Sequence, residues 1–82
     1  MTVRRSADGR IVLEGACPIE DAEPLLQLLL AETECVVDWS RCDLAHAAIV
    51  QILLASGARM IGPPSGAFLR DHVDPALARE RA

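Results

Sequence analysis

The thiol and imidazole groups are the most reactive side chains of this sequence, and one pair of them has a spacing that could bind a metal. Cys42 and His46 stand four residues apart, so on an α-helix they would share one face and offer zinc a sulfur and a nitrogen ligand. A closed zinc site takes four ligands, and His72, Cys17 and Cys35 have no spacing that would supply the rest. A metal-binding unit on Cys42 and His46 is therefore kept as an alternative, and we expect no metal and no cofactor.

The same residues do not define a catalytic set. As a general base, His46 would need a nucleophile and an orienting acid within reach. Cys42 and Asp43 are near it in sequence, but their spacing sets no triad geometry. A small catalytic unit stays part of the same alternative, and we expect a protein that is not an enzyme and has no catalytic residues.

The cysteines also bear on the compartment. Their number is odd, no Cys-x-x-Cys pair is present, and residues 1–10 lack the apolar stretch of about 7 to 15 residues found in signal peptides. The longest uncharged run, residues 44–58, is shorter than the roughly 20 apolar residues of a membrane span. We expect a cytoplasmic protein without membrane insertion, whose free cysteines pack as small buried hydrophobes.

Composition excludes one class of partner. Twelve acidic and eight basic residues give the 82-residue chain a net charge of -4, and one Trp and one Phe offer little base stacking. Both features oppose nucleic-acid binding. A hydrophobic content of 51% is typical of a soluble globular domain. All basic residues are Arg, and this bias, with its many alanines, suggests a GC-rich bacterial genome.

Turn signals and hydrophobic periodicity predict the elements that would position these residues. We expect strands over 2–6 and 10–15 around a turn at Asp8-Gly9, a helix over 19–34, a strand over 35–39, a helix over 44–56 capped by Asp43 and stopped by Gly57, a strand over 59–61, and a helix from Ser65 through His72 that ends at Asp74-Pro75.

This order predicts one domain over residues 1–82 of the α/β class. Strands that alternate with helices favour right-handed crossovers and a parallel sheet. We therefore expect a single small layer sandwich: a four-stranded, mostly parallel sheet with an N-terminal antiparallel hairpin and about three helices. Trp39, near a core strand, is expected to pack inside.

One stretch of the chain resembles a known family. Residues 36–54 read Val-Val-Asp-Trp-Ser-Arg-Cys-Asp-Leu-Ala-His-Ala-Ala-Ile-Val-Gln-Ile-Leu-Leu: a hydrophobic strand that reaches an Asp, a short loop and an apolar helix. This order resembles the STAS domain, the module of anti-sigma-factor antagonists and of sulfate-transporter tails. Residues 11–15 ahead of a leucine-rich helix also resemble its opening. The resemblance covers about residues 3–70 and implies a STAS-like fold that binds a protein partner at the start of the second helix.

The chain departs from the family where the signalling members are phosphorylated. Laid over the family pattern, His46 stands where an Asp precedes the phosphorylatable Ser, Ala47 stands at that Ser, and Ile49 replaces a Gly. Alanine has no hydroxyl, so a phosphate switch is excluded at position 47. Ser40 is a conceivable substitute acceptor, and we interpret its hydroxyl more simply as a loop or capping group.

The second predicted helix has an unusual outer face. Steps of 100° per residue place Ile49, Val50, Leu53 and Leu54 toward the core and Ala47, Ala48, Gln51 and Ala55 opposite. The outer face is small and nearly uncharged, which favours contact with another protein. The predicted partner-binding residues are Ser40, Arg41, Asp43, His46, Ala47, Ala48 and Gln51.

These observations predict a non-enzymatic protein–protein interaction module that works without serine phosphorylation at position 47. The partners implied by the resemblance are a regulatory kinase, an anti-sigma factor or a transporter subunit. An alternative is a cytoplasmic STAS-like subunit of a lipid or solute transport complex. Leu28 and Leu30 widen the apolar stripe of the first helix, so a homodimer that buries these leucines is a further possibility.

Overall fold

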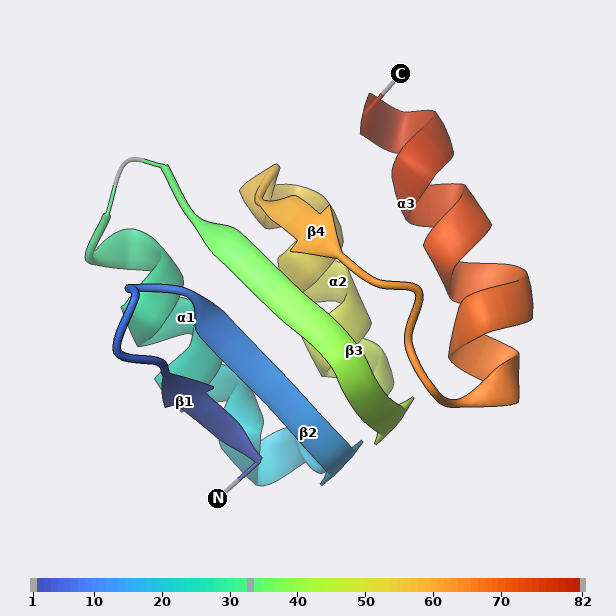
Figure 1. The fold of residues 1–82 in the computed structure, drawn as a ribbon, viewed down its shortest axis with the longest axis horizontal. Helices are drawn as coiled ribbons and strands as arrows, with labels where there is room; N and C mark the ends of the chain where they lie inside the picture. The colour runs from blue at the N-terminus through green and yellow to red at the C-terminus, as the bar shows by residue number, and fades with distance from the viewer. Residues whose placement is uncertain (1, 33, 82) are drawn as a thin grey trace.

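The fold is a four-stranded sheet with helices packed on one face (Figure 1). The structure is a computed structural model that describes residues 2–32 and 34–81, and side chains as far as Arg79. Its elements are β1 (Val3–Arg5), β2 (Ile11–Cys17), a 3-10 turn η1 (Ile19–Asp21), α1 (Ala22–Leu30), β3 (Val36–Ala45), α2 (Ala47–Ser56), β4 (Arg59–Ile61), a π-helical turn η2 (Leu69–Val73) and α3 (Asp74–Arg81).

The sheet has the order β1-β2-β3-β4. β1 pairs with β2 antiparallel, whereas the β2–β3 and β3–β4 pairs are parallel. The turn between β1 and β2 is closed by the Ser6 amide, which donates to the Arg10 carbonyl at 2.7 Å. The predicted α/β class, the N-terminal hairpin and the mostly parallel sheet are therefore confirmed.

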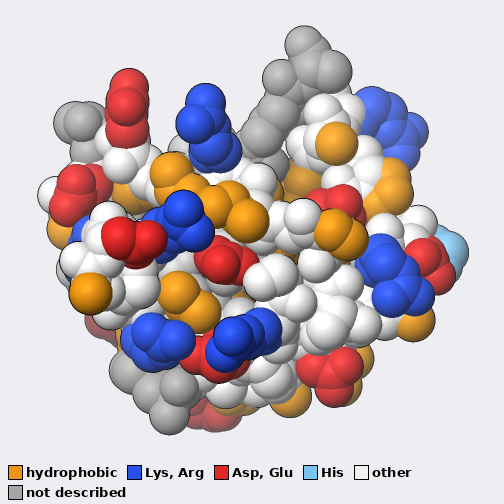
Figure 2. Space-filling view, in the orientation of Figure 1, with side chains coloured by type: hydrophobic (Ala, Val, Ile, Leu, Met, Phe, Trp, Pro, Cys, Tyr) orange, Lys and Arg blue, Asp and Glu red, His pale blue; other side chains and the backbone are white. Residues whose placement is uncertain are grey.

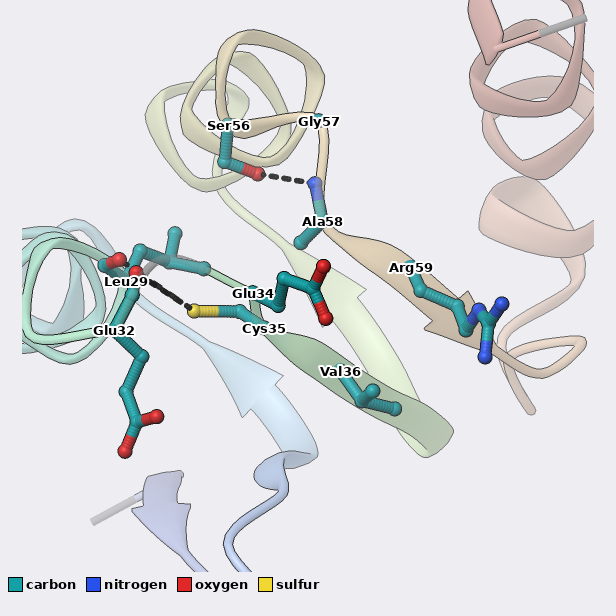
Figure 3. A pocket seen from close by; sticks show the side chains of 9 residues that line it. All are labelled: Leu29, Glu32, Glu34, Cys35, Val36, Ser56, Gly57, Ala58 and Arg59. Carbon is teal, nitrogen blue, oxygen red and sulfur yellow. Dashed lines mark hydrogen bonds between the residues drawn. The ribbon is translucent and has the colours of Figure 1, made fainter.

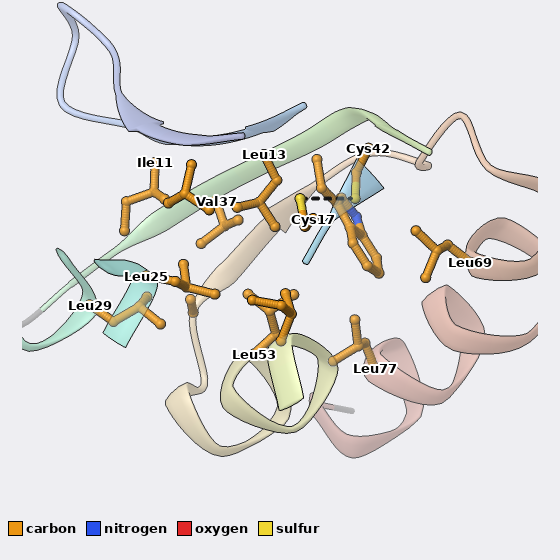
Figure 4. Close-up of a cluster of buried hydrophobic side chains, with 14 residues drawn as sticks. Ile11, Leu13, Cys17, Leu25, Leu29, Val37, Cys42, Leu53, Leu69 and Leu77 are labelled. Atoms are coloured by element: carbon orange, nitrogen blue, oxygen red, sulfur yellow. Dashed lines mark hydrogen bonds between the residues drawn. The ribbon is translucent and has the colours of Figure 1, made fainter. Parts of the chain in front are cut away.

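The core lies between the sheet and its three helices. Figure 4 shows Leu25 and Leu29 from α1, Leu53 from α2 and Leu77 from α3 pointing toward the strand residues. Trp39 is fully buried, as predicted. Charged side chains lie on the opposite face, which Figure 2 shows, and salt bridges join Glu14 to two arginines there. Helices therefore cover one face of the sheet, and the other face is open to solvent.

The structure corrects the boundary between β3 and α2. β3 does not end at Trp39 but continues to Ala45, because the seven-residue β2 offers a parallel partner as far as Cys17, which pairs with Ala45. Residues 40–43, which were predicted to be a loop, and residues 44–45, which were predicted to begin a helix, thus belong to the strand. α2 consequently starts at Ala47 instead of Leu44, and the predicted cap at Asp43 is wrong.

α2 ends at the predicted position, before Gly57. Gly57 follows the last residue of α2 in a left-handed conformation with φ of 68°. Glycine reaches this region without the Cβ penalty that other residues meet. The turn directs the chain into β4, the strand expected over residues 59–61.

The outer helices also differ from the expected boundaries. α1 ends at Leu30 instead of Glu34, and Thr33 lies outside the described residues. At the C-terminus, Asp74-Pro75 does not end the helix. The Asp74 amide donates to the Leu69 carbonyl, an i to i-5 bond that widens the turn before Pro75, and the helix continues to Arg81.

Several apolar side chains lie on other faces than expected. Leu54 is 38% exposed instead of facing the core, while Ile49 and Leu53 are buried as predicted. In α1, Leu28 was expected with Leu30 on the widened apolar stripe but packs against the core, whereas Leu30 is exposed. α1 and α2 lie side by side on a narrow sheet. Only part of the circumference of each helix is therefore buried, and the remaining apolar side chains are exposed. No helix among the described residues is long and apolar enough to cross a membrane.

Candidate protein-docking surface

The carboxyl ends of β2 and β3 meet the start of α2 at one edge of the sheet (Figure 1). The backbone amide of His46 donates to the carbonyl of Cys17 at 3.0 Å, which ties the strand ends together. In open α/β sheets the helix starts and loops cluster at the carboxyl ends of the strands, and ligands bind outside these ends where the strand order reverses. Six of the seven predicted partner-binding residues are exposed, and Ala48 is half-buried.

His46 is the structural start of α2. Its backbone is extended, with φ of -60° and ψ of 149°, and its Nδ1 accepts a hydrogen bond from the Ala48 amide at 3.0 Å. The imidazole thereby satisfies one of the amides that a helix start leaves unpaired.

The predicted residues divide into two groups. Ser40 and Arg41 line a shallow hollow of about 300 Å³ on the open face of the sheet, whereas His46, Ala47 and Gln51 belong to the start of α2. The two groups lie on different layers because β3 continues through residues 40 to 45. The structure does not gather all of them into one patch.

The open-face hollow is a network of paired charges. Ser40 donates from its amide and its hydroxyl to Asp38 Oδ1, at 3.0 and 2.7 Å, and these hydrogen bonds lower the pKa of Asp38. Arg10 lies 3.2 Å from Asp8 Oδ2, and Arg41 lies 3.8 Å from Glu14 Oε2. These arginines are already paired with carboxylates, so the hollow is a weak site for an anion.

Three large apolar side chains that were not predicted as site residues complete the edge. Ile19, Leu44 and Phe68 are 51%, 57% and 63% exposed. Leu44 pairs with Ala16 at the end of the sheet, and Ile19 follows two residues after the last residue of β2. We call Ile19, Leu44, His46, Ala47 and Phe68 the carboxyl-edge surface.

The position of Phe68 depends on a close backbone contact. The Gly66 amide donates to the carbonyl of Cys42 at 3.1 Å, and the Ser65 hydroxyl donates to the same oxygen at 3.1 Å. A Cβ at position 66 would lie 1.7 Å from the carbonyl oxygen of Asp43. Only glycine permits this approach, which brings the start of the last helix to the end of β3.

Only one of these three side chains left a signal in the sequence. Phe68 is the single Phe of the chain and follows a Gly-Pro-Pro-Ser-Gly turn, so its exposure at the start of a helix could have been considered. Leu44 was predicted to lie in a helix but lies in β3, so helical periodicity could not indicate that its side chain is exposed. Exposure of Ile19 depends on the 3-10 turn η1, which periodicity does not reveal.

The structure does not bring Cys42 and His46 together as metal ligands. Cys42 lies in β3 with its side chain fully buried, and His46 is an exposed helix cap. The pair therefore does not share a helical face, and that prediction is wrong. Among the described residues, no three His, Cys, Asp or Glu side chains are grouped so that they could hold a metal ion. Cys42 Sγ instead lies 3.9 Å from Cys17 Sγ.

A second hollow lies at the opposite, amino end of β3 and β4. It has a volume of about 410 Å³ and contains Glu32, Glu34, Cys35 and Arg59 in its lining. Figure 3 shows the Cys35 thiol directed toward α1, where it donates to the Leu29 carbonyl at 3.5 Å. Its thiol is therefore already engaged with the backbone, and the charged side chains around it have mixed signs.

Comparisons with known proteins do not identify a relative. No protein-family model matches the chain, and no curated protein and no solved structure shows significant similarity to it. The functional argument therefore rests on the residues and geometry of the chain.

Proposed function

We propose that this chain is a STAS-like protein–protein interaction module that binds its partner through the carboxyl-edge surface. The observation that carries the proposal is the exposure of Ile19, Leu44 and Phe68 beside the small Ala47 at one end of the sheet. Large apolar side chains around a small, flat residue are typical of a contact surface.

The resemblance of residues 36–54 to STAS domains supports the same location. In the signalling members the partner binds at the start of the helix that corresponds to α2. Ala47 occupies the phosphoacceptor position, so the chain would bind without a phosphate switch there. The free thiols of Cys17, Cys35 and Cys42 support a reducing cytoplasm as the compartment.

The test is a charge placed at the centre of this surface. Ala47→Glu adds a carboxylate that a partner would have to desolvate, so the variant should lose co-purification of the partner from the cells that make the protein. Far-UV circular dichroism should stay unchanged, because Ala47 is exposed. A matched control is Ala7→Glu, which makes the same change at an exposed alanine in the β1–β2 turn.

The control separates a specific surface from a general charge effect. Ala7→Glu should retain the partner, since it lies at the other end of β2. Retention of the partner by Ala47→Glu would refute the surface assignment, and so would equal loss in both variants.

A homodimer is a second candidate, favoured by a separate groove. Leu26, Leu29 and Leu30 of α1 and Ile52 of α2 line a hollow of about 370 Å³. Leu30 is 71% exposed there. Sedimentation equilibrium should show a dimer that Leu30→Glu dissociates, and a wild-type monomer at high protein concentration would reject this candidate.

A further inference from the structure

Two buried cysteines face each other across neighbouring strands. Cys17 is the last residue of β2. Cys42 lies in β3, four residues before His46, the residue that caps α2. Their sulfur atoms are 3.9 Å apart, as the dashed line in Figure 4 shows. Both thiols are free, and their residues are 3% and 0% exposed. The sequence separation of 25 residues hides this pair from any local motif.

The strand register explains why the two sulfur atoms meet. Cys42 pairs with Gly15, and Cys17 pairs with Ala45, so the two cysteines are offset along adjacent parallel strands. Both side chains enter the core on the helix-covered face. A disulfide has an S–S distance of about 2.05 Å, so the sulfur atoms need to approach by roughly 2 Å. Cys17 lies at a strand end, where the chain can adjust more readily than in the middle of the sheet.

We propose that Cys17 and Cys42 are an oxidative modification site, at which a peroxide converts the two thiols into a reversible intramolecular disulfide. Cys17 is the attacking sulfur. It adjoins the exposed Pro18 and is the nearer of the two to solvent. The hydrogen bond between the two thiols lowers the pKa of Cys17 and raises that of Cys42, so Cys17 is the thiol that ionises first.

The oxidation balances with one molecule of hydrogen peroxide. The Cys17 thiolate attacks a peroxide oxygen, the O–O bond breaks, and the leaving hydroxide takes up the proton that Cys17 released, which gives water and a sulfenic acid. The sulfur of Cys42 then attacks the sulfur of Cys17. The S–S bond forms, the S–O bond breaks, and the leaving hydroxide accepts the Cys42 proton as a second water. Two thiols lose two electrons and the peroxide gains them.

The bridge would act on the carboxyl-edge surface. The Cys17 carbonyl accepts from the His46 amide, and the Cys42 carbonyl accepts from Gly66 and Ser65. Both cysteines therefore anchor the segments that carry the surface, and cross-linking them constrains those segments. This consequence rests on the proposed function, whereas the bridge would form whether or not the surface binds a partner.

Peptide mapping of the full chain after hydrogen peroxide treatment tests the site. The protein is oxidised, unfolded, alkylated with iodoacetamide and cleaved after Arg and Glu. This cleavage places each cysteine on its own peptide, residues 15–20, 35–41 and 42–59. The expected product joins residues 15–20 to residues 42–59, with Cys35 alkylated, and dithiothreitol should reverse it.

The pairing must depend on the fold. The Cys17–Cys42 bridge should be about ten-fold more abundant than either pairing with Cys35, because the native structure holds the sulfur atoms together. Oxidation of the chain unfolded in guanidinium should produce mixed pairings. Equal pairing in the native protein, or sulfinic acid on Cys17 without a bridge, would overturn the proposal.

Two variants separate the steps. Cys35→Ser leaves the pair intact and should still form the bridge, whereas loss of the bridge in this variant would contradict the assignment. Cys42→Ser removes the resolving thiol, so Cys17 should accumulate as a sulfenic acid that dimedone traps. Should Cys42→Ser fail to fold, the native mapping with Cys35→Ser decides alone. Partner capture by oxidised and reduced protein then measures the effect on docking separately.

Discussion

The two ends of the sheet are built from different kinds of side chain. At the carboxyl end, Ile19, Leu44 and Phe68 are exposed around the small Ala47. At the amino end, the hollow beside Cys35 contains both acidic and basic side chains in its lining. Burying an apolar surface against a partner lowers the free energy of the complex. Charged groups must be desolvated before they can be buried, which opposes binding. The difference favours the carboxyl-edge surface over the hollow beside Cys35 for protein contact.

The ends also differ in how the chain is held. At the amino end, the Ser56 hydroxyl donates to the Leu53 carbonyl and accepts from the Ala58 amide, and the Arg59 amide donates to the Cys35 carbonyl at 3.0 Å. At the carboxyl end, Gly66 and Ser65 bind Cys42 across a separation of more than twenty residues. A Cβ added at Gly66 would meet the backbone of Asp43, whereas one added at Gly57 would meet open space. A substitution at Gly66 should therefore have the larger effect on stability, and the first of four predictions tests this difference.

The largest effect is expected for Gly66→Ala. The added Cβ would lie 1.7 Å from the backbone oxygen of Asp43, so the backbone must move, and we expect a loss of about 3 kcal/mol in the free energy of unfolding. Gly57→Ala is the control at the amino end. Its Cβ would meet no atom within 4 Å, so only the left-handed φ of 68° costs free energy, about 1 kcal/mol. Urea denaturation measures both, and equal losses would contradict the close contact.

The next effect compares two neighbours on the last helix. Leu69 is 1% exposed and Phe68 is 63% exposed. Leu69→Ala leaves a cavity and should cost about 2.5 kcal/mol, whereas Phe68→Ala should stay within about 0.5 kcal/mol. Phe68→Ala should instead weaken partner capture. A stability loss at Phe68 comparable to that at Leu69 would show that its ring packs inside.

A smaller effect is expected at the start of α2. His46→Ala removes the acceptor of the Ala48 amide and should cost about 1 kcal/mol. His46→Asn restores a capping side chain and should recover most of that loss. Asp43→Ala is the matched comparison, because Asp43 makes no cap hydrogen bond to α2, and its effect should be within about 0.3 kcal/mol. A larger loss for Asp43→Ala than for His46→Ala would reverse the assignment.

The smallest effect concerns Asp38, near the start of β3. Ser40→Ala removes the hydroxyl that donates to Asp38 Oδ1, so the pKa of Asp38 should rise toward its ordinary value of 3.8. A depressed carboxyl pKa stabilises the fold above the unfolded pKa, and this contribution is lost as pH falls through the folded pKa. The variant should thus be slightly less stable at neutral pH and equal to wild type in strong acid. NMR titration measures the pKa, and Ser6→Ala should leave Asp38 unchanged.

Much of the fold could be predicted from local signals. The Asp8-Gly9 turn, the short strand at residues 59–61 and the stop at Gly57 each follow from the conformational preferences of a few neighbouring residues. Burial of Trp39, Ile49 and Leu53 follows from their spacing and size. These features need no knowledge of what packs against them.

The candidate site was only partly predictable. Its location at the start of α2 came from the apolar helix and its alanine face. Leu44 was misplaced because β3 extends through pairing with β2, a contact between residues far apart in sequence. Phe68 reaches the same edge because Gly66 approaches Asp43, another nonlocal contact.

The sequence by itself determined the α/β class, the order of the strands and helices, and the excess of apolar residues over what one small core requires. These properties follow from periodicity, turn residues and composition, which act within a few residues of chain. Only the tertiary structure decided where β3 ends, that His46 caps α2, and that Cys17 lies against Cys42. Each depends on the register of neighbouring strands, and a register is set by packing across the whole domain.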